Sequence, residues 1–120
     1  MKQVTIGVLA IVVSYMLLLG QTKNAAGNLF TGEIMDSQCA AMSGHEMMLK
    51  DENAKDAKDC TVKCVQDGGK YVLYDSKAKS TYTLDDQNKA KEFAGQKVKV
   101  SGTLDKKGST IHVSAISPAS

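Results

Sequence analysis

The chain has 120 residues, which indicates one domain, and its 42% hydrophobic and 23% charged residues are typical of a globular protein rather than a disordered one. Fifteen lysines against thirteen acidic residues give a net charge of +2, which is too small to indicate an acidic partner. Arginine, the side chain that most often reads bases and phosphates with two hydrogen bonds, is absent. The composition therefore argues against sequence-specific binding of nucleic acid.

The N-terminal segment differs in kind from the rest of the chain. Lys2 precedes an almost purely apolar stretch over residues 4–19, and polar residues resume at 21–24. This pattern is typical of a secretory signal peptide, and the apolar stretch is short for a membrane span. We expect residues 1–26 to be a signal peptide or, if uncleaved, an N-terminal anchor that would be the only contact with a membrane. The remaining residues, 27–120, are expected to form one domain in a periplasmic or secreted protein.

The first half of that domain is expected to contain one strand and two helical segments. Residues 29–36 predict the strand, and Asp36 is expected to cap a short helical turn over residues 37–42. A longer helix is expected over residues 53–66, with Asn53 as its N-cap.

The second half is more regularly divided by turn residues. Strands are expected over residues 71–74, 81–84, 97–104 and 110–116, with a helix over residues 87–94 between the second and the third of these. Either Asp85 or Asp86 is expected to cap this helix. In the last strand, Ile111, Val113 and Ala115 are expected to face inward.

Five short strands with a helix between the third and the fourth are typical of an OB-fold. We therefore expect a fold that is mainly β with short helices: a five-stranded OB-fold-like barrel with a helical insertion between strands 1 and 2. An open α+β sheet is the alternative. The usual binding face of an OB-fold would include Tyr71, Tyr74 and Tyr82, of which two are expected to fill the core.

Several short motifs resemble those of a known group of proteins. They are Phe30 to Cys39 with its Asp-x-x-Cys, the following His45, the Cys-x-x-x-Cys of Cys60 and Cys64, and the Ala-Gly-x-x-Val-x-Val-x-Gly that ends at Gly102. In these motifs the chain resembles small exported bacterial OB-fold-like proteins of unknown function. At the level of fold it also resembles periplasmic OB-fold stress proteins. The resemblance implies a fold and export, and it implies no known activity.

The three cysteines are the main candidate functional residues. Cysteines of exported proteins tend to form disulfides. Cys60 and Cys64 lie side by side on the expected helix, where a bridge between them is geometrically awkward. We therefore expect a disulfide from Cys39 to Cys64 (or Cys60), with the remaining thiol buried.

A copper or zinc site is the alternative use of these residues. The three cysteines and His45, which is expected on an exposed loop, form a Cys₃His set that is known for tetrahedral zinc. Four of the six methionines fall between residues 35 and 48, and the thioethers of Met42 and Met47 would suit Cu(I), so copper is ahead of zinc. Thiol exchange is a third option, although the cysteine pair is not a Cys-x-x-Cys at a helix N-terminus.

No catalytic set emerges from the sequence, since neither histidine lies in a nucleophile motif and no phosphate-loop sequence is present. We therefore expect a non-enzymatic binding or envelope-stress module, stabilised by a disulfide and without a cofactor. Its expected partner is an unknown small molecule or a component of the envelope. The alternative is a periplasmic protein that binds copper or zinc.

Overall fold

The computed structural model describes residues 27–51 and 54–119 of the chain. The strands in this part are β1 (Asn28–Asp36), β2 (Tyr71–Asp75), β3 (Ser80–Leu84), β4 (Lys97–Leu104) and β5 (Thr110–Pro118). The helices are α1 (Ser37–Ala41), α2 (Glu46–Asp51), α3 (Ala57–Gln66) and α4 (Gln87–Glu92). The expected class, mainly β with short helices, is confirmed. The predicted signal peptide or anchor, residues 1–26, lies outside the described residues, and within the described ranges no helix has the length and hydropathy to cross a membrane.

The five strands form one sheet whose pairings close on themselves in the order β1-β2-β3-β5-β4, since β4 also pairs with β1. All neighbours are antiparallel except β3 and β5. β1 joins the two halves of the sheet, because residues 28–33 pair with β4 and residues 33–36 pair with β2. A glycine is needed at this change of partner, because a Cβ on Gly32 would collide with the backbone oxygen of Tyr74.

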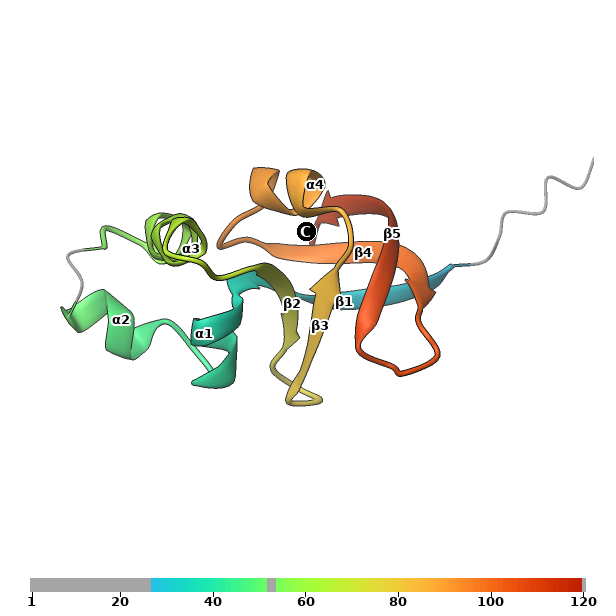
Figure 1. Ribbon diagram of the computed structural model, residues 1–120, viewed down its shortest axis with the longest axis horizontal. Helices are drawn as coiled ribbons and strands as arrows, with labels where there is room; N and C mark the ends of the chain where they lie inside the picture. The colour runs from blue at the N-terminus through green and yellow to red at the C-terminus, as the bar shows by residue number, and fades with distance from the viewer. Residues whose placement is uncertain (1–26, 52–53, 120) are drawn as a thin grey trace, which may run out of the picture.

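A hydrophobic core fills the inside of the sheet, with α4 lying against it (Figure 1). Its buried members are Ile34, Tyr71, Leu73, Leu84, Ala90, Ala94, Val98, Val100 and Ile111. Of the two candidate caps of α4, Asp86 takes the role and accepts the backbone N–H of Lys89. Asp85 instead accepts the backbone N–H of Val113 and so holds β5 beside the start of this helix.

The end of β5 departs from the predicted alternation of inward and outward residues. Ile111 is buried as expected, but Ala115 is exposed and Ile116 is half-buried. The cause is a shift of register against β4 between Ser101 and Gly102, which adds a residue to β5 and reverses the face that follows. The prediction for Ala115 is wrong because a bulge leaves no mark in the periodicity of its own strand.

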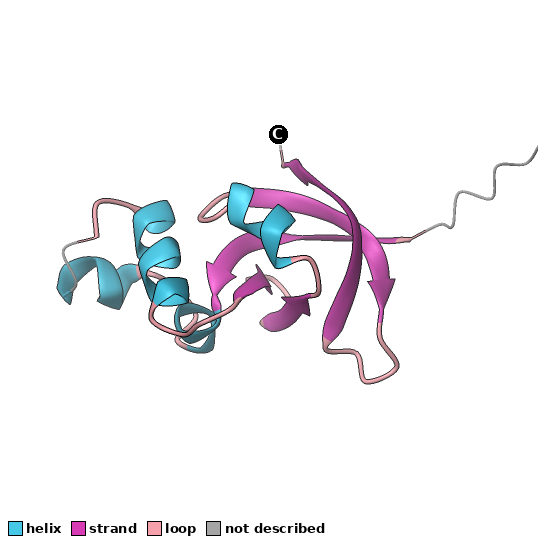
Figure 2. Cartoon of the chain, turned by 45° about the horizontal axis from the view of Figure 1, so that its top comes forward, coloured by secondary structure: helices cyan, strands magenta, loops and turns pink. Residues whose placement is uncertain are grey.

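Three helices connect β1 to β2 and gather at one end of the sheet (Figures 1 and 2). The cap of α1 is confirmed, because Asp36 accepts the backbone N–H groups of Gln38 and Cys39, both at 2.9 Å. α3 begins later than predicted, with Asp56 as its N-cap, while the predicted cap Asn53 lies outside the described residues. α2 was not predicted at all.

Candidate metal centre

A second buried cluster lies where α1 and α3 pack against β1 and β2. Its members are Met35, Cys39, Ala40, Cys60, Cys64, Val72 and Tyr74. Cys39 follows the cap of α1, while Cys60 and Cys64 lie one turn apart on α3. The exposed fraction of each cysteine is 6% or less. The fold thus brings together, away from water, three thiols that are 21 and 4 residues apart in sequence.

The three cysteines are free. The closest pair of sulfur atoms joins Cys39 to Cys60 at 3.8 Å, whereas a disulfide requires about 2.05 Å. The predicted disulfide from Cys39 to Cys64 (or Cys60) is therefore absent from the structure. Of the two cysteines on α3, Cys60 is buried more completely and lies 3.8 Å from Cys39.

The spacing of the sulfur atoms suits a shared metal ion. Their separations are 3.8–4.5 Å. With metal–sulfur bonds of about 2.3 Å, thiolates around one ion lie about 3.8 Å apart in tetrahedral geometry and about 4.0 Å apart in trigonal geometry. A contraction of about 0.5–0.7 Å at the longest separation would let one ion contact all three sulfur atoms.

A pocket of about 280 Å³ opens beside two of the thiols. It is lined by Gln38, Ala54, Cys60, Lys63, Cys64, Gln66 and Asp67. A buried metal site requires such a path, because the ion must reach its ligands through the folded protein. The cluster is thus buried and still accessible to an ion.

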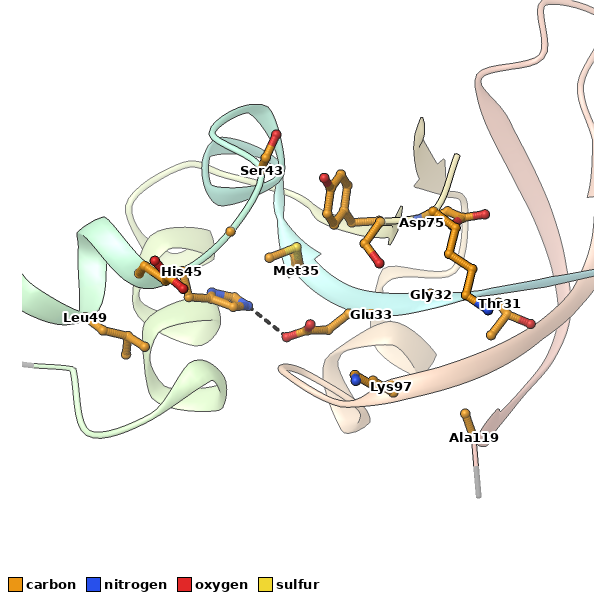
Figure 3. Close-up of a pocket in the computed structure, with 15 residues that line it drawn as sticks. Thr31, Gly32, Glu33, Met35, Ser43, His45, Leu49, Asp75, Lys97 and Ala119 are labelled. Atoms are coloured by element: carbon orange, nitrogen blue, oxygen red, sulfur yellow. Dashed lines mark hydrogen bonds and ion pairs between the residues drawn. The ribbon is translucent and has the colours of Figure 1, made fainter. Parts of the chain in front are cut away.

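His45 does not lie on an exposed loop, as the sequence predicted. It is 8% exposed, and its Nε2 lies 2.9 Å from Oε1 of Glu33 on β1 (Figure 3). Its ligand atom belongs to a group with those of Asp36 and Cys39, all within 4.8 Å of one another, and this group excludes Cys60 and Cys64. The predicted Cys₃His set is therefore divided between two groups that share Cys39.

Of the methionines predicted as soft ligands, the structure describes the side chain of Met42, which it places away from the thiols. Met42 is the C-cap of α1 and is 45% exposed, so it does not belong to the buried cluster. The side chain of Met47 lies outside the part of the chain that the structure describes. Met35, another of the four methionines that cluster in the sequence between residues 35 and 48, packs beside the cysteines.

The surroundings of Cys39 resemble those of a catalytic thiol. His45 would be the base that accepts the thiol proton, and Glu33 would orient His45. The environment opposes that use. Burial, together with the neighbouring carboxylate of Asp36, raises the pKa of Cys39 far above its ordinary value. The side chain is also completely buried, so a substrate has no approach to the sulfur. Both features disfavour Cys39 as a nucleophile.

We expect the folded, metal-free protein to resist alkylation. Burial, followed by the charges of Asp36 and Cys60, raises the pKa of Cys64 to about 11. At pH 8, about one Cys64 thiol in a thousand is ionised, so iodoacetamide should label Cys64 in the native protein about 100-fold more slowly than in urea. The mass increase over time gives both rates. Equal rates in the two conditions would contradict the buried placement of the thiols.

A larger pocket of about 530 Å³ lies beside His45, and we call it the His45 pocket (Figure 3). The His45–Glu33 pair forms part of its wall, together with Leu49, Tyr74 and Lys97. Its lining is mainly apolar with a few polar groups, which is typical of sites for small molecules. The pocket lies over β1 and β2 and the helical insertion.

The tyrosines of the predicted binding face have different positions. Tyr71 and Tyr74 are buried, as expected for two of the three. Tyr82 is half-buried, and its ring packs against that of Phe30 with centroids 5.5 Å apart. Tyr71 and Tyr74 are therefore too buried to stack with a ligand, and the ring of Tyr82 is partly covered by Phe30.

Comparison with known proteins gives one finding about the family. Residues 64–119 are similar to a family described as proteins of unknown function, DUF5818. The match covers slightly less than half of the chain, from the end of α3 through β5. No curated protein and no solved structure matches the chain significantly. The similarity supports a domain of uncharacterised function. Three of the candidate ligands lie outside the matched region: Cys39, His45 and Cys60.

Proposed function

We propose that the protein is a metal-binding domain that holds one soft ion between Cys39, Cys60 and Cys64. The observation that carries this proposal is the presence of three free, buried sulfur atoms within 4.8 Å of one another. Thiolate ligands select Cu(I) and Zn(II) from the common ions. A donor set made only of sulfur is soft, which favours Cu(I) at this group.

The protein contributes a preformed, dry arrangement of ligands. A bare thiolate is costly in this environment, and a bound cation removes that cost by taking the place of the thiol protons. Hydrogen bonds to the backbone hold the helices that carry the ligands. Asp36 caps α1, which carries Cys39, and the backbone oxygen of Cys64 at the end of α3 accepts the N–H of Gly69 at 3.0 Å. Binding should therefore stabilise the folded state as well as load the site.

The wider setting is also a proposal. We propose that the closed sheet is an OB-fold, because its strand order and the helix between β3 and β4 fit that architecture. The apolar segment over residues 4–19 supports export to the periplasm or beyond. A buried site made only of sulfur, with no space for a substrate beside Cys39, favours a carrier or store of metal over an enzyme.

The test is a titration of the reduced protein with Cu(I) under nitrogen, in competition with a coloured Cu(I) chelator. We expect one Cu(I) per chain, confirmed by native mass spectrometry. The double variant Cys60→Ser/Cys64→Ser should bind Cu(I) about 1,000-fold more weakly, because two of the three sulfur ligands are lost. Met42→Leu is the matched control, since this exposed sulfur lies outside the cluster.

Two results would contradict the proposal. The first is a reduced wild-type protein that binds neither Cu(I) nor Zn(II) above the level of the double variant. The second is a protein isolated two hydrogens lighter, with a bond between Cys39 and Cys60, that takes up no metal after reduction. The second result would mean that the cysteines form a structural disulfide, as predicted for an exported protein.

A further inference from the structure

Two buried polar atoms beside Cys39 lack any partner in the structure. Asp36 is fully buried, and its Oδ1 accepts two backbone N–H groups while its Oδ2 accepts none. His45 is 8% exposed, and its Nδ1 is equally without a hydrogen bond. Burial of unpaired polar atoms is costly, so native structures rarely leave two of them in one place. Asp36 and His45 both belong to one group of possible ligands with Cys39.

The contact of the other nitrogen of His45, Nε2, indicates which nitrogen of the ring carries a proton. Nε2 lies 2.9 Å from Oε1 of Glu33, so the N–H on Nε2 donates to this carboxylate. In the neutral ring Nδ1 then carries the lone pair, and it is the nitrogen left without a hydrogen bond to serve as the ligand atom in the group with Asp36 and Cys39. A histidine that binds metal through one nitrogen commonly donates from the other to a carboxylate, which fixes the ring and strengthens the ligand. Glu33 occupies this orienting position.

We propose that Asp36, Cys39 and His45 form a second cation site, specific for Zn(II), that shares the Cys39 sulfur with the three-cysteine site. Oxygen, nitrogen and sulfur together form a donor set typical of zinc, whereas a set of three sulfur atoms is softer. The three atoms lie within 4.8 Å of one another, so a modest contraction brings each to bonding distance of one ion. This proposal goes beyond the copper site, because two of its three ligands take no part there.

Two ions fit the ligands better than one. No single group in the described residues contains all five side chains, because Asp36 and His45 associate with Cys39 and not with the cysteines of α3. When deprotonated, three thiolates and one carboxylate carry four negative charges, which one monovalent or divalent ion leaves largely uncompensated in a buried place. A second, divalent ion next to the first offsets most of that charge, with the Cys39 sulfur as the bridge.

The test is a double loading with Cu(I) and Zn(II), read by native mass spectrometry and elemental analysis. Wild type should hold one of each ion. His45→Gln should keep Cu(I) and bind Zn(II) at least about 100-fold more weakly, because one of the three zinc ligands is lost. Cys60→Ser/Cys64→Ser should show the reverse, with zinc retained and copper lost. His112→Gln is the matched control, because this second histidine is exposed and bound to Asp85.

The crossed design separates failure of this proposal from failure of the copper site. Zinc binding by His45→Gln that equals wild type would overturn the second site and leave the copper site intact. Wild type that binds one ion per chain, with that ion lost in both variants, would mean that all the ligands form one metal site. This result would also overturn the proposed second site. Should His45→Gln fail to fold, Co(II) in Cys60→Ser/Cys64→Ser gives an independent readout. Absorption by a cobalt–thiolate bond there supports Cys39 as a ligand of the second site, and its absence opposes it.

Discussion

Replacing Cys39 with alanine is expected to abolish the binding of both ions. Cys39 is the one side chain that belongs to both ligand groups. Its removal leaves two sulfur atoms at the first site and one oxygen and one nitrogen at the second. We expect the affinity for Cu(I) and for Zn(II) to fall about 1,000-fold or more, beyond the 10- to 100-fold that is usual when only a supporting group is removed. Competition titrations with each ion measure the two losses.

The same substitution should leave the metal-free domain folded. The side chain is fully buried, so its loss creates a small cavity and should lower the free energy of unfolding by about 1–2 kcal/mol. Urea unfolding in the presence of a chelator checks this. Met42→Ala, at the exposed end of the same helix, should alter neither stability nor binding. Retention of either ion at wild-type affinity by Cys39→Ala would show that the two sites do not share this sulfur.

The sheet was largely predictable because its signals are local. Alternation over residues 97–104 and the glycines and aspartates between strands fixed the positions of the elements to within a few residues. The cap at Asp36 was equally local, since a carboxylate before a helix bonds to N–H groups two and three residues on. What the sequence could not show was that the second oxygen of this carboxylate is left unpaired.

The candidate site depended on contacts that no local pattern reveals. His45 follows Gly44, which is typical of an exposed loop, yet α2 and β1 together bury it against Glu33, twelve residues earlier. Its place in one group with Asp36 and Cys39, and not with Cys60, follows from the path of the chain between α1 and α3. The ligand types were thus recognisable from composition, while their division into two groups required the fold.

The largest loss of stability is expected from Gly95→Ala. Gly95 has a φ of +74°, a conformation in which a side chain is strained. A Cβ at this position would lie 2.5 Å from the backbone nitrogen of Lys58 and 2.7 Å from the carbonyl carbon of Ala57, both at the start of α3. Neither backbone atom can move without displacing the helix. We expect the free energy of unfolding to fall by about 4 kcal/mol and the Tm by about 15–25 °C.

Gly108→Ala separates the two causes of this loss. Gly108 has a φ of +72°, but a Cβ there would meet no atom closer than 3.9 Å. It should therefore show only the conformational cost, about 1 kcal/mol. The difference between the variants measures how closely α3 is held to the sheet. Since α3 carries Cys60 and Cys64, Gly95→Ala should also weaken Cu(I) binding, whereas Gly108→Ala should not. Equal losses of stability in the two variants would mean that α3 can move away from the sheet at little cost, and the spacing of the three sulfur atoms would then depend on the bound ion.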